Sequence, residues 1–136
     1  MTKNCVFCNL KDEIIYENKY FYAVFDVHPV SPGHALIITK THIVSLLDLK
    51  TLQWAQLQKA IKEVIKKMLK HKSIKQKPQG YNIGNNEGEI AGRTINHLHI
   101  QIIPRYKEDV KNPKGGIRWV IPKLADYTKW NKNTIT

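Results

Sequence analysis

Two histidines and a glutamine alternate with apolar residues in the segment 96–103, which reads Asn-His-Leu-His-Ile-Gln-Ile-Ile. Successive side chains of a β-strand point to opposite faces, so His97, His99 and Gln101 would share one face of a strand. The leucine and isoleucines between them would share the other face and could enter a hydrophobic core. An ordinary half-exposed strand could carry the same residues, but three polar side chains in line suit the floor of an active site.

The loop before this segment strengthens the active-site interpretation. Residues 85–92 read Asn-Asn-Glu-Gly-Glu-Ile-Ala-Gly and are rich in asparagine and glycine. Loops of this composition can offer backbone N–H groups to a phosphate. The loop therefore favours an active site over an ordinary half-exposed strand.

A pair of cysteines near the N-terminus forms a second chemical motif. Cys5 and Cys8 are a C-x-x-C pair, and two thiolates at this spacing can bind zinc. The pair could equally be a redox site or two small buried residues. No helix signature typical of a thioredoxin-like site follows it, which weakens the redox interpretation.

The elements that must position these residues follow from hydrophobic patterning. Strands are expected where β-branched and aromatic residues cluster, at 20–26, 34–39, 81–85 and 96–103. An amphipathic helix is expected between the second and third of them, beginning near Asp48 or Thr51 and ending near Lys72. Turn residues between the first two strands favour an antiparallel pair. The order predicts an α+β domain whose antiparallel sheet carries one long helix on one face.

The composition excludes several classes of protein. A chain of 136 residues suits one domain, and two cysteines are too few for a disulfide-rich scaffold. The longest apolar run has six residues, from Tyr20 to Phe25, whereas a membrane-spanning helix needs about 20. The first residues lead into no apolar signal region, so we expect a cytoplasmic protein with no membrane partner.

The net charge of +11 is the most unusual property of the composition. Such an excess favours polyanionic partners, although it can also serve solubility alone. Eight lysines and one acid lie between Lys59 and Lys77, on the expected helix, where a solvated face is the simpler explanation. No aromatic residues alternate with the basic ones as on an RNA-stacking sheet, so a nucleic-acid partner is not favoured.

Residues 92–105, which read GRTINHLHIQIIPR, resemble the signature of the histidine triad (HIT) superfamily of nucleotide hydrolases and transferases. The likeness extends to 25–29, 33–42 and 86–88, and it covers nearly the whole chain from about 5 to 127. Several motifs in the same order make the resemblance specific. It implies one HIT domain over 1–136, with a core at 5–127, a half-barrel sheet and a basic C-terminal tail to residue 136. It also implies a homodimer.

The resemblance implies that a histidine is the nucleophile. His99 matches the residue that attacks the α-phosphate of a nucleotide, which gives a nucleotidyl-histidine that water or another acceptor then resolves. Thr94 matches a hydroxyl near the leaving group. Gln101 stands where many members have a third histidine, and its NH₂ could donate to a phosphoryl oxygen.

The same resemblance implies the residues that bind the nucleotide. Asp26 matches the ligand of the ribose hydroxyls, although it could also be an ordinary turn-capping aspartate. Asn86 matches a polar residue facing the phosphate, and Arg93 would place a cation where charge develops. The positions of the apolar base pocket are equally suited to the core: Val24, Val27 and Leu36.

The resemblance also completes the cysteine motif. Related proteins add two histidines to the pair, and the matching residues here are His42 and His97. A structural zinc held by Cys5, Cys8, His42 and His97 would tie the N-terminus to the catalytic strand. The other three histidines are expected in turns or on the surface: His28, His34 and His71.

Two features bear on the reaction. Glutamine at the third triad position is typical of the branch that contains galactose-1-phosphate uridylyltransferase and the dinucleoside-polyphosphate phosphorylases. This chain is much shorter than those two-repeat enzymes, and 107–118 resembles the tail of short bacterial HIT hydrolases. We therefore expect a hydrolase of dinucleoside polyphosphates or adenylated small molecules, with an adenine or other purine nucleotide as substrate. The alternatives are nucleotidyl transfer to phosphate and a weakly catalytic nucleotide- or RNA-binding protein.

Overall fold

The structure is a computed structural model that describes residues 2–131, so the last part of the predicted tail, 132–136, lies outside the described residues. Its strands are β1 (Tyr16–Glu17), β2 (Phe21–Phe25), β3 (Ala35–Thr39), β4 (Gly80–Gly84) and β5 (His99–Arg105). Its helices are α1 (Thr51–Leu69) and the short α2 (Pro122–Ala125). Single 3₁₀ turns lie at Leu46–Asp48, Glu89–Ala91, Gly116–Val120 and Tyr127–Lys129.

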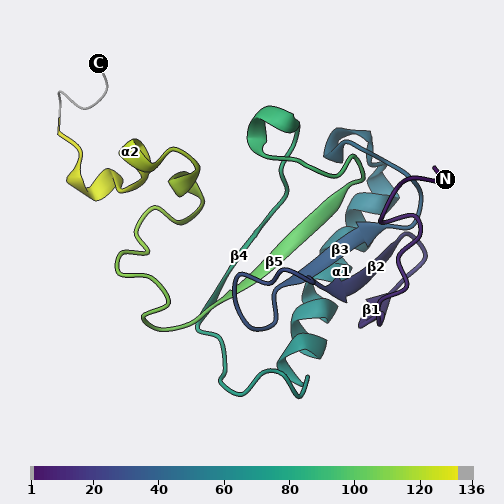
Figure 1. The fold of residues 1–136 in the computed structure, drawn as a ribbon, viewed down its shortest axis with the longest axis horizontal. Helices are drawn as coiled ribbons and strands as arrows, with labels where there is room; N and C mark the ends of the chain where they lie inside the picture. The colour runs from purple at the N-terminus through teal and green to yellow at the C-terminus, as the bar shows by residue number, and fades with distance from the viewer. Residues whose placement is uncertain (1, 132–136) are drawn as a thin grey trace.

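The five strands form one antiparallel sheet in the order β1-β2-β3-β5-β4, and the long helix α1 lies on one face of it (Figure 1). This confirms the predicted α+β fold. In the sheet Val24 pairs with Leu36, which pairs with Gln101, and Ile38 pairs with His99. The strand that carries the polar residues therefore lies beside the central strand of the sheet.

The element boundaries differ most from the predicted ones at the start of the last strand and at the end of the helix. The last strand begins at His99 and not at Asn96, because the backbone N–H of Leu98 bonds to the Ile43 carbonyl outside the ladder. The helix ends at Leu69 and not near Lys72. The two-residue strand β1 was not predicted, since such a short segment has too few residues to show a pattern.

The two faces of the sheet bury different sets of residues. The apolar stripe of α1 packs against alternate residues of the strands and gives the main core, whose members include Phe21, Ile37, Val64, Met68 and Ile102. A smaller cluster of Phe7, Val24, Leu36 and Ile38 covers part of the opposite face, under the N-terminal segment. Because α1 occupies one face, the polar side chains of β5 are left on the other.

The segment after β5, residues 106–131, leads away from the sheet as a C-terminal arm (Figure 1). At its base Arg105 forms a bidentate ion pair with Asp109, with N–O distances of 2.7 and 2.8 Å. The hydroxyl of Tyr106 donates to the carbonyl of Pro32 at 2.7 Å. Several large apolar side chains of the arm are exposed: Ile117, Trp119, Val120, Ile121 and Tyr127. No helix among residues 2–131 is long and apolar enough to cross a membrane.

Candidate active site and metal centre

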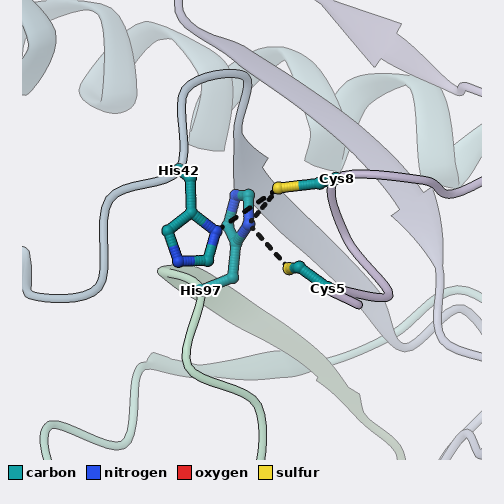
Figure 2. A group of neighbouring side chains, drawn as sticks. All are labelled: Cys5, Cys8, His42 and His97. Atoms are coloured by element: carbon teal, nitrogen blue, oxygen red, sulfur yellow. Dashed lines mark hydrogen bonds between the residues drawn. The ribbon is translucent and has the colours of Figure 1, made fainter. Parts of the chain in front are cut away.

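Four side chains from three separate segments converge on the sheet face opposite α1 (Figure 2). Cys5 and Cys8 come from the N-terminal loop, His42 follows β3, and His97 precedes β5. Cys5 Sγ lies 3.3 Å from His97 Nδ1, and Cys8 Sγ lies 3.3 Å from His42 Nδ1 and 3.6 Å from His97 Nδ1. All four donor atoms lie within 4.8 Å of one another, as predicted for one metal centre.

The donor set fits zinc. Tetrahedral zinc with thiolate and imidazole ligands separates neighbouring donor atoms by about 3.3–3.8 Å, and the three S–N distances fall in this range. His97 Nε2 donates to the carbonyl of Thr39 at 2.7 Å, which leaves Nδ1 unprotonated for a metal. Burial lowers the pKa of His97, so the ring is held in the neutral form that binds metal. These residues can hold a zinc ion without rearrangement.

The sulfur of Cys8 is also prepared for ligation. Burial disfavours its thiolate, but hydrogen bonds with Thr2 and Cys5 outweigh burial and lower the pKa of this thiol. The nearby thiolates have an effect on Tyr22, whose pKa rises to about 12 through burial and then through the charges of Cys5 and Cys8. The Tyr22 hydroxyl donates to the carbonyl of Phe7, which ties the loop between the cysteines to β2.

His99, the first residue of β5, has the orientation that a nucleophile needs. Its Nδ1 donates to the carbonyl of His97 at 2.7 Å. A carbonyl can only accept, so the proton of the neutral ring is on Nδ1 and the lone pair is on Nε2. The ring of Phe7 packs edge-on against it, with the ring centres 5.0 Å apart. One carbonyl and one aromatic ring thus hold the imidazole with a free nitrogen.

A cavity of about 380 Å³ lies against this ring and brings most of the predicted site residues together. Val24 and Leu36 form its buried floor, because they pair across β2 and β3 on the face opposite α1. Val27 lies at its rim and is 70% exposed. The other predicted site residues that line it are Asp26, Asn86, Thr94, His99 and Gln101.

Arg93 is the one predicted substrate-binding residue that does not line this cavity. Its Nε donates to Asn96 Oδ1 at 3.1 Å, and one Nη donates to the Val44 carbonyl at 3.4 Å. The same Nη lies 4.0 Å from the Glu87 carboxylate. The guanidinium therefore supports the loop that contains Asn86 from behind.

Asp26 caps a turn and also lines the cavity. One carboxylate oxygen accepts from the backbone N–H of His28 at 2.9 Å, as a turn-capping aspartate does. The other oxygen lies 3.5 Å from His34 Nε2, and the residue lines the cavity. The turn fixes the carboxylate at the edge of the cavity, where it can accept further hydrogen bonds.

His34 was expected in a turn or on the surface; it ends the turn 31–34, where its backbone N–H donates to the Ser31 carbonyl, but its side chain is not at the surface. It is only 3% exposed, and its Nε2 lies 3.0 Å from Gln101 Oε1. Alternation along 34–38 puts His34 on the same face as Leu36 and Ile38, a signal that could have placed it in the site. The prediction held for His28, which is exposed, whereas His71 is half-buried against the ring of Phe25.

A second and larger cavity, of about 750 Å³, lies between the C-terminal arm and the strands β4 and β5. Its walls are mostly apolar and include Ile83, Ile103 and Trp119. Gln101 and Asn86 line both cavities. The two cavities therefore meet where the predicted phosphate-binding residues lie.

Comparison with known proteins agrees with the sequence resemblance. The family model described as the HIT domain matches residues 8–108. An uncharacterised HIT-like protein of Methanocaldococcus jannaschii is 32% identical over 117 residues, which cover 82% of this chain and 87% of that protein. The AP-4-A phosphorylase of Mycobacterium tuberculosis is 32% identical over 126 residues, covering 88% of this chain and 62% of the relative.

Two further similarities concern activity and metal binding. The adenosine 5'-monophosphoramidase HNT1 of Saccharomyces cerevisiae is 35% identical over 109 residues, covering 76% of this chain and 64% of that enzyme. A crystal structure of a Zn-bound histidine triad family protein from Mycobacterium smegmatis superposes with a TM-score of 0.68. It is 29% identical, and the match covers 80% of both chains. The family model spans most of the chain and the fold agrees, so this protein belongs to the HIT family.

Proposed function

We propose that the chain is a nucleotide-processing enzyme that hydrolyses dinucleoside polyphosphates or adenylated small molecules at the α-phosphate. The observation that carries this proposal is the state of His99. Its Nδ1–H is committed to the His97 carbonyl, so Nε2 offers its lone pair beside a nucleotide-sized cavity. The similarity to a phosphorylase and a phosphoramidase of nucleotides supports the same assignment.

The cavity suits the nucleoside half of such a substrate. Val24 and Leu36 offer an apolar floor for an adenine or other purine base. The Asp26 carboxylate would accept hydrogen bonds from the ribose hydroxyls. Val27, at the exposed rim, would cover the open edge of the base. These contacts select the nucleotide and are indifferent to the group that leaves.

The reaction has two balanced steps. His99 Nε2 attacks the α-phosphorus and forms a P–N bond while the bond to the leaving group breaks, and Thr94 would donate a hydrogen bond to that group. Water then attacks the same phosphorus and loses a proton to the solvent, the P–N bond breaks with its electron pair returning to Nε2, and the nucleoside monophosphate leaves the neutral imidazole behind. Gln101 and Asn86 would donate hydrogen bonds to the phosphoryl oxygens as their charge grows.

Two features bear on the group that leaves. The larger cavity begins at Gln101 and Asn86, so it lies on the far side of the phosphate from the base pocket. Its size and apolar lining favour leaving groups as large as a second nucleotide or an acyl or amino substituent. Arg93 would add its positive charge from behind the phosphate-binding loop.

The metal centre has a structural part in this proposal. A zinc ion at Cys5, Cys8, His42 and His97 would fix the N-terminal loop, including Phe7, against the nucleophile. Its two thiols must stay reduced to bind metal, which supports a cytoplasmic location. The homodimer expected for the family belongs to the same proposal.

The test is a substrate panel of diadenosine polyphosphates and adenosine 5'-phosphoramidate, with products separated by chromatography. We expect adenosine monophosphate from the wild-type chain and a fall of about 10³-fold or more in kcat for His99→Ala. His71→Ala, which alters a histidine outside both cavities, is the matched control and should keep its activity. Equal rates in the two variants would show that His99 is not the nucleophile.

Nucleotidyl transfer to phosphate is the second candidate, and Gln101 is the residue that favours it. A glutamine cannot exchange protons at neutral pH, so it gives no help to an attacking water. Adding inorganic phosphate to the assay distinguishes the reactions. Hydrolysis gives the nucleoside monophosphate, whereas phosphorolysis gives the nucleoside diphosphate in its place.

A further inference from the structure

His34 lies behind the proposed catalytic residues without touching the nucleophile. It occupies the turn that leads into β3 and follows Gly33, whose φ of +85° is in the left-handed region that favours glycine. A side chain at position 33 would also meet Ile74 Cδ1 at 2.6 Å, so the turn is packed closely against the body of the protein. The backbone thereby directs the His34 ring into the protein, where it is almost completely buried.

The two ring nitrogens of His34 have different partners, and these determine the tautomer. The backbone N–H of Val30 points at Nδ1, with an N–N distance of 3.2 Å. A backbone N–H can only donate, so Nδ1 must carry a lone pair. In the neutral ring the proton is therefore on Nε2. This N–H faces Gln101 Oε1 at 3.0 Å and, at 3.5 Å, one oxygen of Asp26.

This tautomer decides which way the Gln101 amide can point. Nε2–H of His34 needs an acceptor, so the amide oxygen of Gln101 turns inward and its NH₂ turns toward the cavities. The flipped amide would set NH₂ against N–H and would present an oxygen to a phosphate. Both consequences are unfavourable, because two donors would face each other and an acceptor oxygen would face the anionic phosphate oxygens.

We infer that His34 is a positioning residue that holds the Gln101 amide with its NH₂ directed at the substrate phosphoryl group. The inference rests on the proposed function, because it assigns Gln101 to the phosphate. A glutamine in place of a third histidine can present either its amide oxygen or its NH₂ to the substrate, and only the NH₂ can stabilise an anion. The hydrogen bonds run from the Val30 N–H to His34 and from His34 to Gln101. The fixed backbone N–H of Val30 thereby determines that Gln101 presents a donor to the reacting group.

A double-mutant cycle on the zinc-loaded full-length chain tests this inference. His34→Phe keeps the ring shape and removes both hydrogen bonds, and we expect kcat to fall about 10- to 100-fold with KM changed less than about 3-fold. When His34→Phe is added to Gln101→Leu, the further fall in kcat should be less than about 2-fold. His34→Gln, whose amide can still donate to Gln101, should recover part of the loss. Independent, multiplicative losses in the cycle would overturn the positioning role.

A measurement that needs no turnover separates this inference from the proposed function. Nitrogen-15 NMR of the histidine rings reports which nitrogen carries the proton, and we expect the Nε2–H form for His34. The side-chain NH₂ signals of Gln101 should shift in His34→Phe and stay in place in His71→Phe. A Nδ1–H ring, or unmoved Gln101 signals, would overturn the inference even if the enzyme is active. Lack of turnover on every substrate, with the expected spectra, would count against the proposed function alone.

Discussion

The chain enters and leaves its sheet on two segments, the N-terminal loop (residues 2–15), whose Phe7 packs against His99 at the start of β5, and the C-terminal arm (residues 106–131), which leads away from the sheet (Figure 1). The loop buries Phe7 and sends two cysteines to a four-residue metal centre. The arm leaves most of its large apolar side chains exposed and is attached at its base by the Arg105–Asp109 pair and Tyr106. The N-terminal loop is therefore attached through the metal-ligand cluster and a buried side chain, whereas the C-terminal arm is attached through surface hydrogen bonds.

The contrast shows how a segment without regular structure can be made rigid. A metal that is bound by ligands from distant parts of the chain binds the folded state alone, so its binding free energy stabilises the fold, and a buried aromatic ring adds contact area. An exposed ion pair contributes little, since water already stabilises both charges. We expect the N-terminal loop to unfold together with the sheet. A mutation in the arm should alter only the local stability of the arm.

Removing a metal ligand should have the largest effect on this contrast. Cys8→Ser leaves three donors, so we expect loss of bound zinc and a fall of about 10 °C in Tm. Elemental analysis and calorimetry measure the two quantities, and a chelator should lower the Tm of the wild type in the same way. Asn4→Ser, an exposed change in the same loop, is the control. An unchanged Tm in the metal-free protein would show that metal binding does not stabilise the N-terminal loop.

Truncating one aromatic residue in each segment should have a smaller and unequal effect. Phe7 is 7% exposed and packs on His97 and His99, so Phe7→Ala should lower the free energy of unfolding by about 2–4 kcal/mol. Trp119 is 43% exposed, and Trp119→Ala should cost less than about 1 kcal/mol. Urea unfolding of both variants gives the two values. Similar costs would mean that the arm is as much part of the fold as the loop.

The smallest effect concerns the base of the arm and its pH dependence. A hydrogen bond from Arg105, followed by one from the Tyr106 backbone, lowers the pKa of Asp109 to about 2. The unfolded carboxyl has a pKa of about 3.9. The ionised Asp109 carboxylate therefore stabilises the folded arm fully above that pH, and this stabilisation is lost as the pH falls through about 2. Tryptophan fluorescence should change between about pH 4 and pH 2 in the wild type. Asp109→Asn should reduce this change and leave the part that comes from Asp126, whose pKa hydrogen bonds from Thr128 and Asn112 also lower to about 2.

Trypsin gives a second measurement of the same attachment at neutral pH. Cleavage at the arm lysines, Lys107, Lys111 and Lys114, should be a few-fold faster in Asp109→Asn than in the wild type. Glu108→Gln removes a neighbouring charge that takes no part in the Arg105 pair and should leave the rate unchanged. Equal cleavage of all three proteins would show that the ion pair does not anchor the arm.

Periodicity predicted the sheet and the polar face of β5 well, because alternation is a local property. His99 and Gln101 lie on one side of β5, while Ile100 and Ile102 enter the core on the other. The metal ligands needed the family resemblance, since nothing local connects Cys5 with His97. His34 was missed because its partner, Gln101, is 67 residues away in the sequence.

Two further features depend on tertiary contacts that sequence patterns do not contain. Arg93 follows the asparagine- and glycine-rich loop, but its guanidinium turns to Asn96 and the Val44 carbonyl, outside the cavity. The arm has apolar residues typical of a buried segment, yet Ile117 and Val120 are exposed. Composition favours burial for such residues and does not say against which surface they pack.

The carbonyl of His97 has a consequence for how such a protein can change during evolution. Its side chain belongs to the metal centre, whereas the acceptor that orients His99 is its backbone. Any amino acid at position 97 supplies that carbonyl. A descendant could therefore lose all four metal ligands, replace them by apolar packing, and still inherit the same tautomer of His99. The metal centre and the acceptor that orients His99 share one residue, yet mutation can separate them.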